Sequence, residues 1–105
     1  MTYINSLEAL ADPTRRALIE RLVKGSCSVS ELNAVVSVSQ PAVSQHLSVL
    51  KSAGLVTVKK EGARRIYSLA PDGLFELRRY IENLWDDVLA AFQLAADNQA
   101  KGEIK

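Results

Sequence analysis

Polar side chains that could hydrogen-bond a nucleic acid gather in one short segment, residues 39–47. Ser39 and Gln40 stand at its start, where the free amides of a helix's first turn also favour a phosphate. Ser44 and Gln45 follow one turn later, and a glutamine can form two hydrogen bonds with the edge of an adenine. We expect the first pair to position the chain and the second to distinguish bases. The alternative is a solvated polar face on an ordinary core helix.

His46 lies in the same segment and is the only histidine of the 105 residues, and Cys27 is the only cysteine. A closed zinc site needs several nitrogen or sulfur ligands, and these two residues are expected in different elements. We therefore expect His46 to hydrogen-bond a phosphate or neighbouring backbone, with no metal and no cofactor bound. Cys27 is expected to be buried, with a reactive thiol as the alternative, because only Lys24 among the cations adjoins it.

A second cluster is cationic and surrounds a predicted turn at Glu61 and Gly62. Its members are Lys59, Lys60, Arg64 and Arg65, and we call residues 59–65 the wing. Arginines there could contact phosphates or enter a minor groove, where narrow A·T tracts concentrate negative potential. Lysines on exposed strands also protect against edge-to-edge aggregation, and the two roles are compatible.

The net charge of +1 hides an asymmetry along the chain. Residues 1–70 hold nine bases and five acids, a net charge of +4, whereas residues 71–105 hold four bases and seven acids, a net charge of −3. A polyanion would therefore be drawn to the first two thirds. Arg15 and Arg16 belong to this basic part and could also face a nucleic-acid backbone, but we expect them to be simply solvated.

Length and composition predict a single domain over residues 1–105, with 48% hydrophobic and 24% charged residues. No apolar run approaches the roughly 20 residues that span a membrane. The N-terminus lacks the basic and apolar regions of a signal peptide, and one cysteine cannot form a disulfide within the chain. We expect a cytoplasmic protein without membrane contact.

Caps and apolar spacing predict four helices before the wing. They cover residues 3–11, 13–24, 29–36 and 40–53. Asp12 can accept from the free amides of the second helix, with Pro13 at its first position. Ser28 and Glu31 have the spacing of a capping box at the third. Gly54 is expected to end the fourth.

Residues 55–60 and 64–69 alternate with the period of strands and predict a hairpin. Residues 71–73 are expected to break the chain before a long helix over residues 74–96. The fold class is therefore mainly α with a small β-hairpin: four helices, two strands and a fifth helix, the order of a winged helix-turn-helix with an extra helix at each end. The final helix has more apolar surface than the rest of the chain can cover.

Three segments together resemble the ArsR/SmtB family of bacterial winged-helix repressors. They are LADPTRR at residues 10–16, SQPAVSQHL at residues 39–47 and AGLV at residues 53–56. The likeness covers nearly the whole chain, and residues 80–87 are similar to those of the SdpR-like members. The resemblance implies a repressor that binds a pseudo-palindromic operator in double-stranded DNA and blocks the polymerase.

The resemblance also implies a homodimer held by the first and last helices, the latter at residues 74–96. The expected interface residues are Ile4, Leu7, Leu77, Ile81, Leu84, Trp85, Val88 and Phe92. Where family members place metal thiolates, this chain has Ser28, Ser30 and Asn33, and its final helix contains no histidine. The chain is therefore placed in the SdpR-like branch, which does not sense metals.

Two functions from other classes are weighed against this one. A winged helix can serve as a protein–protein interaction module without operator binding. An enzyme would need a catalytic constellation, but the chain has no G-x-S-x-G motif, no phosphate-binding loop and no Cys/His pair with an orienting acid. We expect a protein that is not an enzyme.

Overall fold

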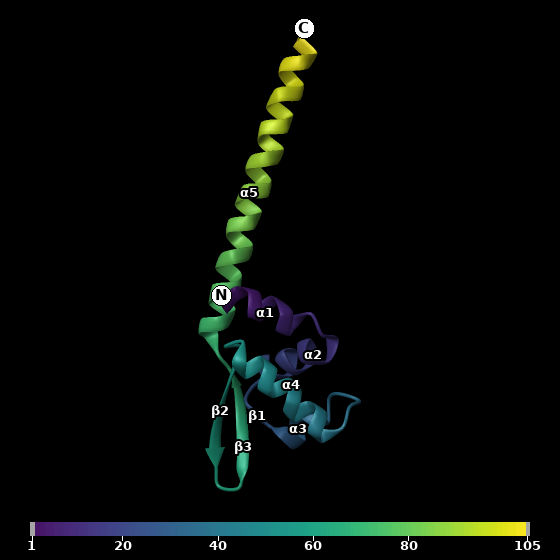
Figure 1. Ribbon diagram of the computed structural model, residues 1–105, viewed down its shortest axis with the longest axis vertical. Helices are drawn as coiled ribbons and strands as arrows, with labels where there is room; N and C mark the ends of the chain where they lie inside the picture. Colours follow the sequence, from purple (N-terminus) through teal and green to yellow (C-terminus); the bar gives the residue numbers. More distant parts are fainter. Residues whose placement is uncertain (1, 105) are drawn as a thin grey trace.

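The computed structural model describes residues 2–104, with side chains from residue 6 to residue 99. Within that range it has five helices and one three-stranded antiparallel sheet (Figure 1). The elements are α1 (Thr2–Leu10), α2 (Pro13–Val23), β1 (Cys27–Ser28), α3 (Val29–Asn33), α4 (Gln40–Ser52), β2 (Val56–Glu61), β3 (Arg64–Leu69) and α5 (Pro71–Ile104). The predicted winged helix-turn-helix is confirmed.

Local capping places the helix starts where the sequence predicts them. The Asp12 carboxylate accepts from the amide of Arg15 at 3.0 Å, with Pro13 in the first turn of α2. Ser28 and Glu31 form both halves of the predicted capping box at α3. Each cap satisfies amides that the first turn of a helix leaves without a partner within the helix.

Helix α3 is shorter than predicted, because it ends at Asn33 and not near Val36. The Asn33 side chain donates to the backbone carbonyl of Val38 at 2.9 Å. This hydrogen bond closes the segment between α3 and α4 into a tight turn, which the helical continuation would have prevented. The turn sets how α4 leaves α3.

The sheet has a third strand that the sequence analysis missed, so the predicted hairpin is incomplete. Its order is β1-β3-β2, with Cys27 opposite Tyr67 and Ser28 opposite Ile66. Two residues are too few to show a period of two, which is why β1 escaped prediction. The hairpin turn itself lies at Gly62 and Ala63, one residue later than expected, and Gly62 has the positive φ of +62° that a tight turn requires.

One hydrophobic core joins the helices to the sheet. Its fully buried members come from α2, α3, α4, the segment before β2 and the strands β1 and β2, and include Leu18, Leu32, Val43, Leu47, Leu50 and Leu55. Cys27 belongs to this core, as predicted, and is 0% exposed. The apolar stripe of α4 is thus turned inward, which fixes the rotation of that helix.

Helix α5 begins at Pro71 and extends to Ile104, beyond the predicted bounds of residues 74–96 at both ends. The predicted break at residues 71–73 is wrong, because a proline at the first helical position has a suitable φ and needs no amide partner. Gly73 lies in the first turn, where an added Cβ would sit 2.0 Å from the carbonyl oxygen of Gly54. The glycine therefore allows α5 to start directly against the end of α4.

Beyond this start, α5 projects away from the other elements, with α1 against its base and the wing at the opposite end of the molecule (Figure 1). The longest dimension is 74 Å. No helix within the described residues is both long enough and apolar enough to cross a membrane.

The predicted dimer residues differ in how far they are exposed. Leu77 is only 7% exposed within its own chain, so it leaves little surface for a partner. The side chain of Ile4 lies outside the described residues. The remaining ones expose apolar surface, Val88 in part, and are Leu7, Ile81, Leu84, Trp85, Val88 and Phe92. Phe92 is 71% exposed and Trp85 59%, an uncommon state for large apolar side chains on one helix.

Candidate nucleic-acid interface

The outer face of α4 is polar and uncharged over its first two turns. The Ser39 hydroxyl accepts from the amide of Ala42 at 3.3 Å and so defines where the helix begins. Because Val43 and Leu47 point into the core, Gln40, Ser44 and Gln45 are left exposed. Gln40 and Ser44 are four residues apart and share one side of the helix. The structure thus presents these predicted residues on one accessible surface.

His46 is half-buried, and its Nδ1 atom lies 3.3 Å from Nη1 of Arg15. Arg15 also donates through Nε to the carbonyl of Ala9 at 2.6 Å and through Nη2 to that of Glu8 at 3.3 Å. These are among the last carbonyls of α1, which have no partner within that helix. Arg15 therefore connects the end of α1 to α4, with His46 at the contact.

The expectation that Arg15 and Arg16 are simply solvated is wrong. Arg16 donates through Nη1 to the carbonyls of Leu10 at 2.9 Å and Ala11 at 3.0 Å. A cation near the C-terminus of a helix is also favoured by the helix dipole. The two arginines together cap α1, a role that the sequence could have indicated because they follow the end of α1 by only five or six residues.

The four cations of the wing are all exposed, as expected for contact with a polyanion. In the β2–β3 ladder Lys60 faces Arg65, and Glu61 faces Arg64. Successive side chains along a strand leave opposite faces, so Arg64 and Arg65 point to different sides of the wing. A cleft of about 270 Å³ separates the wing from the starts of α3 and α4, and its lining includes Ser30, Gln40 and Arg65.

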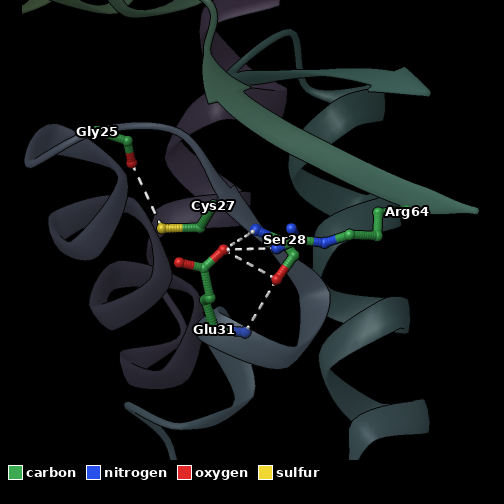
Figure 2. Close-up of polar contacts among 5 residues, drawn as sticks. All are labelled: Gly25, Cys27, Ser28, Glu31 and Arg64. Atoms are coloured by element: carbon green, nitrogen blue, oxygen red, sulfur yellow. Dashed lines mark hydrogen bonds and ion pairs between the residues drawn. The ribbon is translucent and has the colours of Figure 1, made fainter. Parts of the chain in front are cut away.

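Arg64 has an ion pair that the sequence analysis missed. Its Nη2 atom lies 3.2 Å from Oε1 of Glu31, an oxygen that also accepts from the amide and the hydroxyl of Ser28 (Figure 2). The Ser28 hydrogen bonds, with Arg64 contributing less, hold the pKa of the Glu31 carboxyl below its usual range. The contact joins residues 33 positions apart, and no local pattern announces it.

Nothing in the described side chains gathers three or more His, Cys, Asp or Glu as a metal site would need. Cys27 donates through its thiol to the carbonyl of Gly25 at 3.4 Å (Figure 2). Burial raises the pKa of this thiol, so it is held in the protonated form that neither attacks nor ligates readily.

A short capped helix, a tight turn, a second helix with an uncharged polar face and a basic hairpin define a winged helix-turn-helix, a class of DNA-binding domain. Residues 12–58 match the family described as bacterial regulatory protein, arsR family. The chain is 47% identical over 92 residues to the HTH-type transcriptional regulator Rv2034 of Mycobacterium tuberculosis, across 88% of this chain and 86% of that protein. The chain therefore belongs to the arsR family of transcriptional regulators.

Two further comparisons bear on mode of action and assembly. The biofilm growth-associated repressor of Agrobacterium fabrum is 40% identical over 79 residues, which are 75% of this chain and 65% of that one. The solution structure of the homodimeric winged helix-turn-helix DNA-binding domain of Mb0332 from Mycobacterium bovis aligns with a TM-score of 0.66 and 26% identity, covering 84% of this chain and 82% of the other. One relative is thus a named repressor and another a homodimer.

Proposed function

We propose that this regulator is a homodimeric repressor, of its own or a neighbouring operon, that binds a pseudo-palindromic operator in double-stranded DNA. The observation that carries the proposal is the uncharged polar face of α4, which the burial of Val43 and Leu47 turns outward beside a basic wing. A helix of this kind fits the major groove, where each base pair presents a distinct pattern of donors and acceptors. We call α4 the recognition helix.

The residues of the interface would divide between positioning and sequence reading. Ser39 and Gln40 would contact phosphate at the start of the recognition helix, together with its free amides. Ser44 and Gln45 would contact base edges. His46 would support them from its contact with Arg15 and reach a phosphate through its other ring nitrogen.

The wing would supply phosphate or minor-groove contacts through its lysines and arginines. Lys59, Lys60 and Arg65 are exposed and flank the turn. Each phosphate that such a cation neutralises releases condensed counterions, so binding weakens with salt whatever the sequence. The wing would therefore contribute affinity more than sequence preference.

Dimerisation would cover the apolar surface that one protomer leaves open on α5 and α1. Ile81, Leu84 and Trp85 are each about half exposed or more, and a two-fold axis would place the same stripe of a second copy against them. Two recognition helices related by that axis would meet half-sites about one helical turn apart. The homodimer of Mb0332 supports this arrangement.

We also propose that the chain, as one domain over residues 1–105, belongs to the SdpR-like branch, which does not sense metals. Ser28 and Ser30 stand where family members place thiolates, and Asn33 is committed to the turn after α3. We further infer a cytoplasmic binding protein without catalytic activity, because a regulator of this family acts on DNA.

Selection from random DNA, followed by binding measurements on the selected duplex and on a shuffled duplex, tests the proposal. Gln45→Ala should lower the preference for the selected duplex, because only that duplex offers the paired base edge. Arg65→Ala should weaken binding to both duplexes and reduce the salt slope of binding by about 0.9. Equal losses on both duplexes for Gln45→Ala would contradict base reading. A wild-type protein that shifts no DNA at low salt, its own promoter region included, would favour the protein-interaction module.

A further inference from the structure

The two adjacent arginines of the wing have different surroundings. Ser28 of β1 pairs with Ile66 of β3, and Arg64 lies two residues from Ile66 on the same face of that strand. This register carries the Arg64 side chain to the start of α3. Arg65 leaves the opposite face and stands across from Lys60. Arg64 forms an ion pair with α3, the helix that precedes the recognition helix, whereas Arg65 only lines the cleft beside it.

The capping box holds the Glu31 carboxylate in place independently of Arg64. Its Oε1 atom accepts from the Ser28 amide and hydroxyl, each at 3.0 Å, and the Ser28 hydroxyl accepts in turn from the Glu31 amide at 3.3 Å. In Figure 2 the Arg64 guanidinium approaches this same oxygen from the strand. Because the cap already orders the carboxylate, the ion pair loses less side-chain entropy than one between two free side chains.

The ion pair competes with DNA phosphate for the Arg64 side chain. The side chains of Arg64 and Glu31 are 63% and 49% exposed, and water screens a pair of that kind. Its formation withholds one wing cation from phosphate and ties the wing to α3. Its opening would release a cation and free the wing to move.

We propose that Glu31 is a specificity-determining residue, an inference that rests on the proposed function. By holding Arg64 against α3, Glu31 lowers affinity for DNA in general, since non-specific binding depends on the number of available cations. On the operator the same contact keeps the wing beside the start of the recognition helix, where Gln40 and Arg64 line one cleft. Glu31 therefore lowers the affinity of the protein for the operator less than it lowers the affinity for random DNA.

Glu31→Gln tests this with the cap retained, because glutamine is the other residue that a capping box uses at that position. The matched control is Glu61→Gln, which removes the same charge from the wing itself and leaves the Glu31 contact in place. Arg64→Gln provides the background in which the ion pair cannot form. Thermal unfolding of each variant verifies that the fold is kept.

The assay is fluorescence anisotropy with a selected duplex and a shuffled duplex of the same composition, over a series of salt concentrations. Glu31→Gln should raise affinity for the shuffled duplex by about two- to fivefold more than Glu61→Gln does, and steepen its salt slope by about 0.9. Affinity for the selected duplex should rise less. In the Arg64→Gln background, Glu31→Gln should have no effect beyond that of Glu61→Gln.

The inference is overturned if Glu31→Gln and Glu61→Gln act alike on both duplexes, or if the Glu31→Gln effect survives in the Arg64→Gln background. A wild-type protein that binds neither duplex overturns the proposed function as well, so the two failures are distinguishable. The NMR signal of the Arg64 Nε–H group reports the contact without DNA. The chemical shift of this group should change more in Glu31→Gln than in Glu61→Gln. An unchanged chemical shift in Glu31→Gln also overturns the inference.

Discussion

Gly73→Ala should destabilise the protein although alanine is the better helix former. The added Cβ would lie 2.0 Å from the Gly54 carbonyl oxygen and 2.6 Å from its carbonyl carbon. Ordinary contact begins near 3.4 Å, so α5 and the end of α4 would have to separate by about 1.4 Å. Both atoms belong to backbone, and no change of rotamer can relieve the clash.

Two opposing effects decide how much Gly73→Ala lowers the free energy of unfolding. Overpacking of this kind costs about 1–3 kcal/mol, whereas replacing glycine by alanine in a helix contributes at most about 1 kcal/mol in the other direction. We expect a net loss of about 1–2 kcal/mol. For a chain of this size that corresponds to a fall in Tm of about 4–8 °C per kcal/mol.

The assay is thermal unfolding followed by circular dichroism at one fixed protein concentration, because dimerisation makes Tm depend on concentration. Ala90→Gly, on an exposed position of α5, measures the propensity difference in the same helix without a clash. If Gly73→Ala unfolds at or above the wild-type Tm, the close approach of α5 to Gly54 is not what the glycine serves.

Three further predictions concern the helix caps, the stripe of exposed apolar side chains on α5 and the stability of the protein in acid. Ser39→Ala should cost about 1 kcal/mol in urea unfolding, because the Ala42 amide loses its acceptor; Ser39→Asn should restore most of it, and equal losses would refute the capping role. Trp85→Glu should yield monomers in analytical ultracentrifugation, because it places a charge in the stripe, whereas Asp86→Ala should stay dimeric; a dimeric Trp85→Glu protein would refute the assignment of the stripe. The Arg15 amide lowers the pKa of Asp12, and the Ser28 hydrogen bonds lower that of Glu31. Carboxyls with lowered folded-state pKa values contribute stability above their unfolded-state pKa and lose it as the pH falls through the range near 4. Asp12→Asn and Glu31→Gln should therefore flatten the loss of stability between about pH 5 and pH 3. An unchanged pH profile of stability would contradict both assignments.

Local interactions explain why much of the fold could be predicted. The caps at Asp12, Ser28 and Ser39 act over three residues, a distance that the sequence displays directly. The inward stripe of α4 follows from the spacing of its apolar residues. The sequence alone therefore predicts the polar face of the recognition helix.

Interactions between distant segments explain the remainder. The Arg64–Glu31 pair depends on the register of β1 against β3, which two residues of strand do not reveal. The sequence predicts a solvated Arg15, because the contact of Arg15 with His46 depends on how α2 and α4 pack. Leu77 fits the dimer stripe by spacing but is covered within its own protomer. In each case tertiary packing selected among residues that the local pattern treats alike.

The central claim is that two recognition helices of a dimer read one symmetric operator. The most direct test is footprinting of the complex on the duplex that the protein selects, with the stoichiometry measured on the same sample. We predict two chains per duplex and two protected half-sites centred about one helical turn apart. One chain per duplex, or protection without two-fold symmetry, would contradict the account.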